Sequence, residues 1–151
     1  MTHIYVFGSV NLDYVAEVER LPLPGETLTG STLSLFSGGK GGNQAHGAAG
    51  VSATAGSVSM VGCVGEDSDG VRLRSDLEKH GVEVATLVSV PVQSGSALIT
   101  VDADSENTIV VIPGANHAWP ADLVSSIPLT AADVVVVQLE VPFETVRAIA
   151  E

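Results

Sequence analysis

The residues best able to bind a ligand form the loop 38–43, in which four glycines surround Lys40 and Asn43 follows. Glycine has no Cβ, so backbone N–H groups in such a loop can approach a ligand closely. The N-terminus of a following helix adds positive potential. The backbone N–H groups, the Lys40 ammonium and the Asn43 amide could therefore hold a polyhydroxyl compound or an anion. A flexible connection between a hairpin and a helix accounts for the same glycines equally well.

Two familiar phosphate-binding loops do not fit this segment. A P-loop needs glycine, four residues and then Gly-Lys-Ser/Thr, whereas Ser34 occupies the first position here and Gly41 the last. A dinucleotide fingerprint that begins at Gly39 would need glycine where Gln44 stands. The loop is therefore not explained as a nucleotide-phosphate site of either kind.

The surrounding sequence predicts strands that alternate with helices. The expected strands of the main sheet are 4–8, 55–64, 86–90 and 134–137, the last being four valines that we expect to be buried on both faces. The expected helices are 43–49, stopped by Gly50, then 67–80, then a short one at 120–126, and one that begins after Pro142. This alternation indicates an α/β fold with a parallel sheet and crossover helices.

Two predicted hairpins interrupt that alternation. The first joins strands 14–18 and 27–36 through a proline- and glycine-containing turn, and the second joins strands 97–101 and 108–112 through the polar segment 102–107. We expect the hairpins at 14–36 and 97–112 to pair into a small separate sheet that projects from the core.

Composition limits the function further. The formal charge is −12, from 6 Lys+Arg against 18 Asp+Glu, so nucleic acid and anionic membranes are not expected partners. Cys63 is the only cysteine, which excludes an internal disulfide, and its apolar neighbours predict a buried, inert thiol. The first residues do not have the pattern of a signal peptide, and no apolar run is long enough for a membrane helix. We expect a cytoplasmic protein.

The glycine loop and several other segments together resemble the N-terminal signature of the ribokinase (pfkB-type) family of carbohydrate kinases. The loop continues as Gln44-Ala45 and is followed by Ser52 and Gly62. The other matching segments are Gly8-Ser9-Val10-Asn11-Leu12-Asp13, Pro22-Leu23-Pro24-Gly25-Glu26-Thr27, Gly62-Cys63-Val64-Gly65-Glu66-Asp67 with Gly70, Pro113-Gly114-Ala115-Asn116 and Gln138-Leu139-Glu140. They keep the order of the family and cover essentially the whole chain, although any one of them alone would be weak.

The resemblance assigns sugar-binding roles to six residues. It implies that Asn11 and Asp13 bind sugar hydroxyls, which suits a vicinal diol because a carboxylate accepts and an amide both donates and accepts. Taken alone, Asp13 could be a turn residue, Lys40 could be solvated, and Glu140 could favour the start of the next helix. The substrate-binding residues implied by the resemblance are Asn11, Asp13, Gly39, Lys40, Asn43 and Glu140.

The resemblance also implies a lid and a set of cofactors. The two hairpins resemble the family's β-sheet lid, which closes over the sugar and commonly pairs with a second subunit, so a homodimer through the lid is expected. ATP, Mg²⁺ and a monovalent cation activator are implied, with their sites outside these 151 residues. His46 and His117 have no second ligand at suitable spacing, so no metal site is expected and both are interpreted as structural or exposed.

The family's catalytic base lies in a Gly-Ala-Gly-Asp motif that this sequence does not contain, and Gly65-Glu66-Asp67 belongs to the N-terminal pattern instead. Glu151 falls about two turns into its expected helix, with no closing strand after it. We therefore expect a truncated ribokinase-like domain, with residues 1–151 as the substrate-binding portion and no catalytic residue of their own.

Three functions follow as alternatives. The first is ATP-dependent phosphorylation of a sugar, D-ribose to D-ribose 5-phosphate, with this chain supplying the sugar-binding half and being inactive alone. The second is a non-catalytic sugar-binding fragment. The third is a nucleoside kinase of the adenosine type or a kinase of another sugar.

Overall fold

The computed structural model describes residues 2–54 and 56–151 and contains two four-stranded sheets. The first sheet is parallel and has the order β5 (Leu87–Val90), β4 (Val58–Gly65), β1 (Ile4–Phe7), β8 (Val134–Val137). β4 is buried along its whole length, because apolar clusters cover both faces of the sheet. The predicted α/β fold with a parallel sheet is confirmed. The expected second strand starts at Val58 rather than at position 55, which lies outside the described residues.

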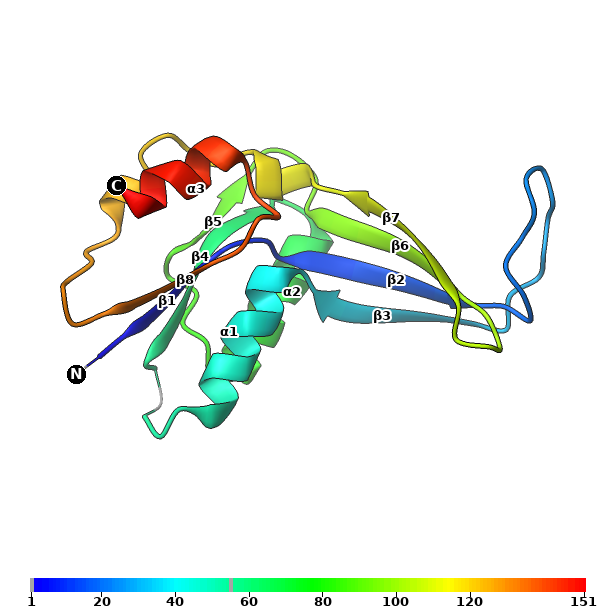
Figure 1. Ribbon diagram of the computed structural model, residues 1–151, viewed down its shortest axis with the longest axis horizontal. Helices are drawn as coiled ribbons and strands as arrows, with labels where there is room; N and C mark the ends of the chain where they lie inside the picture. Colours follow the sequence, from blue (N-terminus) through cyan, green and yellow to red (C-terminus); the bar gives the residue numbers. More distant parts are fainter. Residues whose placement is uncertain (1, 55) are drawn as a thin grey trace.

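The second sheet projects from the first and is formed by the two predicted hairpins (Figure 1). Its order is β3 (Thr32–Gly38), β2 (Asn11–Glu17), β6 (Gly95–Val101), β7 (Asn107–Ile112). The outer pairs are antiparallel, and β2 joins the two hairpins by pairing with β6 in parallel. The predicted separate sheet is therefore confirmed, although residues 27–31 stay outside the strand that was expected to begin at position 27.

Two helices lie on one side of the parallel sheet and one lies on the other (Figure 1). α1 (Lys40–Val51) and α2 (Ser68–Lys79) pack against β4 through the core that contains Leu73 and Leu77. The opposite side carries the 3₁₀ turns η1 (Gly114–His117) and η2 (Val124–Ser126) together with α3 (Phe143–Ala150). The short helix expected at 120–126 is reduced to η2 and the turn before it.

The prediction for the helix after the glycine loop was wrong at both ends. α1 begins at Lys40 rather than at Asn43, and it continues through Gly50 to Val51. A glycine inside a helix costs about 1 kcal/mol relative to alanine but does not by itself end the helix. Packing of Ala45 in the core keeps this glycine-rich segment helical. By contrast, α2 matches the expected 67–80, with Asp67 as N-cap and His80 as C-cap.

The burial predicted for the four valines was also wrong. These valines form β8, in which the side chains of Val134 and Val135 are 46% and 40% exposed. Within residues 2–54 and 56–151, β8 lies at the edge of the parallel sheet and pairs only with β1, so no described strand lies along its outer side. Among the described residues, no helix is long and apolar enough to cross a membrane.

Candidate sugar-binding site

The glycines of the loop allow α1 to pack directly against the connection between β1 and β2. Gly39 is the N-cap of α1 and has a φ of 83°, which side-chain-bearing residues rarely adopt. A Cβ on Gly39 would lie 2.8 Å from the backbone oxygen of Ser9, and a Cβ on Gly41 would lie 2.7 Å from the same atom. The Gly42 N–H donates a hydrogen bond to that oxygen at 2.9 Å. The loop therefore needs glycine for close packing of two chain segments.

Glu140 joins this packed loop to the end of the parallel sheet. Its Oε2 accepts hydrogen bonds from the Ser9 hydroxyl at 2.7 Å and from the Lys40 backbone N–H at 3.0 Å. Its Oε1 lies 2.5 Å from the Lys40 ammonium. Burial raises the pKa of Glu140, but the hydrogen bonds from Lys40 and Ser9 outweigh burial and hold this pKa below its ordinary value. Glu140 is therefore an ionised carboxylate at neutral pH.

These contacts change the interpretation of the loop as a ligand cradle. The backbone N–H groups of Lys40, Gly41 and Gly42 donate to Glu140 or Ser9, so they already have partners within the protein. Asn43 lies in the first turn of α1 with an exposed side chain, and its backbone N–H donates to Gly39. The expected approach of those three N–H groups to a ligand is not what this structure shows, whereas the Lys40 and Asn43 side chains remain accessible.

Asn11 is oriented by a second asparagine to which the sequence analysis gave no role. The buried Asn116 amide donates to Asn11 Oδ1 at 2.7 Å and to the Val10 carbonyl oxygen at 3.2 Å, and its own Oδ1 accepts from the Val10 N–H at 2.8 Å. A Cβ on Gly95 would lie 2.0 Å from Asn116 Nδ2 and 2.4 Å from Asn11 Oδ1. The residues that position Asn11 and Glu140 are thus Asn116, Gly95 and Ser9. The sequence motifs contained Ser9 and Asn116, but no motif indicated Gly95.

Asp13 lies two residues beyond Asn11 on β2 and faces the same surroundings as Glu140. Burial, and then the negative charge of Glu140, raise the pKa of Asp13. A Cβ on Gly38, which neighbours Asp13 across the β2–β3 pair, would lie 2.3 Å from Asp13 Oδ2. Among the described residues no hydrogen bond to the Asp13 carboxylate is present, so both of its oxygens can accept donors.

A cavity of about 130 Å³ lies between the Asn11–Asn116 pair, Glu140 and the end of β7. The polar part of its wall comes from hydroxyl, amide and carboxylate side chains, and Val111 of the second sheet adds an apolar edge. The lining residues are Ser9, Asn11, Val111, Pro113, Asn116, His117 and Glu140. A small cavity with converging hydroxyl, amide and carboxylate groups is suited to a neutral polyhydroxyl ligand.

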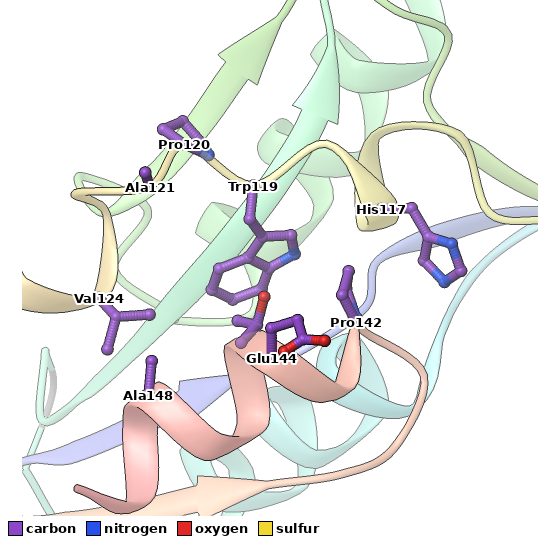
Figure 2. A pocket seen from close by; sticks show the side chains of 9 residues that line it. His117, Trp119, Pro120, Ala121, Val124, Pro142, Glu144 and Ala148 are labelled. Carbon is purple, nitrogen blue, oxygen red and sulfur yellow. The ribbon is translucent and has the colours of Figure 1, made fainter.

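A larger cavity of about 390 Å³ lies between η1 and α3, and His117 contributes to its wall as well (Figure 2). Its lining contains Trp119, Pro120, Val124 and Ala148, and Glu144 is its only carboxylate. Because fewer hydrogen-bonding groups converge there, the smaller cavity is the better candidate for a sugar.

The predictions for Cys63 and for the histidines have different outcomes. Cys63 is fully buried, and burial raises its pKa to about 12, so the predicted burial of this thiol is confirmed. His117 is exposed at the cavity edge, as one of its two interpretations required. Sequence spacing offered His46 no second ligand, but the packing of α1 on α2 brings Asp76 and His80 next to it, so the expectation of no metal site stays a prediction.

Comparison with known proteins agrees with this fold. The model of the pfkB family of carbohydrate kinases matches residues 1–151. The chain therefore belongs to the pfkB family of carbohydrate kinases. It is 37% identical to a ribokinase of Lactococcus lactis, and the match covers 100% of this chain and 50% of that relative.

Two solved structures share the architecture. A ribokinase from Thermotoga maritima is 34% identical with a TM-score of 0.85, over 97% of this chain and 48% of that one. An Arabidopsis thaliana ribokinase, solved in complex with ribose and ATP, is 31% identical with a TM-score of 0.82, over 99% of this chain and 49% of that one. The chain thus spans about half the length of the relatives it matches.

Proposed function

We propose that this chain supplies the sugar-binding part of a kinase that transfers a phosphoryl group from ATP to D-ribose and forms D-ribose 5-phosphate. The observation that supports the proposal is that Asn11 and Glu140 line one small cavity. Lys40 is paired with Glu140, and Asp13 is close enough to Glu140 for that charge to raise its pKa. Membership of the pfkB family supports carbohydrate phosphorylation. The ribose in the Arabidopsis thaliana complex supports a pentose as the substrate.

In this proposal Asp13 and Asn11 bind two neighbouring sugar hydroxyls. Both Asp13 oxygens accept hydrogen bonds, and the Asn11 amide nitrogen can donate because its oxygen is already held by Asn116. Glu140 accepts three hydrogen bonds from Ser9 and Lys40, so it has one lone-pair site left for a sugar hydroxyl. Gly39 maintains the packing of this corner, and Lys40 and Asn43 contribute from its open side.

ATP, when bound, supplies the phosphoryl group. The oxygen of the primary hydroxyl forms a bond to the γ-phosphorus, the bond from that phosphorus to the ADP oxygen breaks, and the hydroxyl proton passes to a base. The residues of this chain hold and orient the sugar, and we expect the base, Mg²⁺ and a monovalent cation activator to be bound by residues outside it.

Isothermal titration calorimetry with D-ribose tests the sugar site directly. Asp13→Asn replaces one acceptor by a donor and should weaken ribose binding about tenfold or more, since hydrogen bonds to charged groups contribute about 1.5–3 kcal/mol. Asp104→Asn is the matched control, because that aspartate lies in the exposed β6–β7 turn. Equal ribose affinity in both variants and the original chain would contradict the assignment of Asp13.

The alternatives give different results in the same experiments. A non-catalytic sugar-binding chain binds ribose but forms no ADP when ATP is added. A nucleoside kinase binds adenosine more tightly than ribose. ADP formation by the 151-residue chain with ribose would contradict the expectation that it is inactive alone. A cytoplasmic location stays a prediction of the sequence.

We also propose that a second copy of the chain pairs with the second sheet. The strand register places Val15, Phe36, Ile109 and Val111 on the same face as Asp13, and the last three are each more than half exposed. Sedimentation should show a dimer that Ile109→Asp dissociates. The matched control is Leu98→Asp on the opposite face, and equal dissociation by both substitutions would contradict the proposal.

A further inference from the structure

Three potential metal ligands meet where α1 packs on α2, on the outer side of the core that covers the parallel sheet. His46 comes from α1, and Asp76 and His80 come from α2 one turn apart. One ligand atom from each residue lies within 4.8 Å of the other two. The three residues are separated in sequence and meet only through the packing of the two helices.

The individual distances leave room for an ion rather than direct bonds. His46 Nε2 lies 3.8 Å from Asp76 Oδ2. The two imidazole rings are 4.5 Å apart between centroids, with their planes at 50°. Two ligands of one tetrahedral zinc ion are about 3.3 Å apart, as bonds of about 2.0 Å require. The separation of His46 Nε2 and Asp76 Oδ2 is therefore about 0.5 Å longer than in a zinc site, a difference that a small rotation of either side chain closes.

The hydrogen bonds of the two histidines also suit metal ligation. His46 Nε2 is buried and has no hydrogen-bond partner among the described residues. His80 Nδ1 lies 2.7 Å from the Asp76 carbonyl oxygen, which can only accept, so Nδ1 carries the proton and Nε2 the lone pair. A ring N–H held by a backbone carbonyl is the usual arrangement of a metal-binding histidine.

We propose that His46, Asp76 and His80 bind a divalent transition-metal ion of the Zn²⁺ class, which ties α1 to α2. Two imidazoles and one carboxylate suit Zn²⁺ or Co²⁺ better than Mg²⁺, which prefers oxygen ligands. The side chain of His80 is 57% exposed, so an ion can enter from solvent and keep a water molecule as its fourth ligand. The site is separate from the sugar cavity, and its test does not depend on the proposed kinase activity.

Calorimetry with ZnCl₂ on the chain after treatment with a chelator tests the proposal. One ion should bind per chain, and Zn²⁺ should raise the melting temperature. Co²⁺ should give the visible absorption of a tetrahedral centre. Asp76→Asn and His80→Ala should each weaken binding about tenfold or more, and neither removes a core side chain.

His117→Ala is the matched control, because it removes one imidazole elsewhere and should leave Zn²⁺ affinity unchanged. His46→Ala should abolish binding too, but its side chain is largely buried, so its folding is checked by circular dichroism. Absence of Zn²⁺ binding, full binding in His80→Ala, or equal loss in His117→Ala would each overturn the proposal.

Discussion

Replacing Asn116 should destabilise the fold and the proposed sugar site together, because its buried amide holds three polar groups. Asn116→Ala removes the partners of the Val10 N–H, the Val10 carbonyl oxygen and Asn11 Oδ1. Asn11 lines the cavity, so water can replace its lost partner. The two backbone groups of Val10 lose their side-chain partner in the buried interior.

The expected cost of Asn116→Ala follows from those two groups. Each buried polar group left without a partner costs about 1–3 kcal/mol, which gives about 2–6 kcal/mol in total. This is a large part of the roughly 5–15 kcal/mol that stabilises an ordinary domain. In a chain of this length the melting temperature should fall by at least about 4 °C.

Urea unfolding followed by circular dichroism measures this cost. Asn107→Ala is the control, because Asn107 is exposed on β7 and its replacement should change the unfolding free energy by less than about 0.5 kcal/mol. A loss below about 1 kcal/mol for Asn116→Ala would refute the reasoning, since even one unsatisfied buried group costs that much.

Asn116→Asp separates the hydrogen-bond pattern from side-chain size. The new carboxyl keeps an acceptor for the Val10 N–H but places a second acceptor against Asn11 Oδ1 and the Val10 oxygen. Ionisation is disfavoured there, so the folded-state pKa of the new carboxyl lies above its unfolded value. The folded state then binds the proton more tightly, and the variant should lose stability as pH rises. Wild-type stability of this variant at pH 7 would contradict the assigned bonds.

Three further predictions concern other parts of the fold. Gly39→Ala should lower the free energy of unfolding in urea by about 2 kcal/mol or more, because Gly39 has a positive φ and lies close to the β1–β2 connection. In the control Gly47→Ala the new methyl group has free space, so this substitution should stabilise α1 by up to about 1 kcal/mol. Asp67→Asn should cost about 0.5–2 kcal/mol, because Asp67 caps α2. Burial raises the pKa of Asp67, but hydrogen bonds, chiefly from Ser94, lower this pKa overall. The ionised Asp67 therefore contributes stability that is lost as pH falls below about 4. Asp67→Asn should accordingly lose less unfolding free energy over that pH range than the original chain does. Cys63 should resist a thiol reagent in the folded chain and react in urea; rapid labelling without denaturant would show that the thiol is accessible.

Much of the fold could be predicted because local patterns agree with the tertiary structure. The helix expected over 67–80 is one example, because Asp67 caps its start and Gly81, with a positive φ, follows its C-cap in the structure. The valines of β8 illustrate the limit. Their composition is that of a strand buried on both faces, but burial depends on which strands lie beside it, and β8 is at an edge.

The site was predictable as a set of residues but not as a set of contacts. Asn11, Asp13, Lys40 and Glu140 were selected from motifs, and the structure brings them to one corner of the molecule. The pairing of Lys40 with Glu140 spans 100 residues, so no local pattern could indicate it. The neighbours of His46 were not predictable for the same reason, because Asp76 and His80 belong to the next helix and its C-cap.

The carboxylates of Glu140 and Asp13 have pKa values shifted in opposite directions. Hydrogen bonds from Lys40 and Ser9 lower the pKa of Glu140 despite its burial, so its ionised form contributes stability that is lost as pH falls. Burial and the charge of Glu140 raise the pKa of Asp13, so ionisation of Asp13 opposes folding at neutral pH. Hydroxyl groups that donate to Asp13 would favour its ionised form and offset that cost. The unsatisfied carboxylate, rather than the glycine loop itself, is therefore the group whose energy a bound sugar would change most.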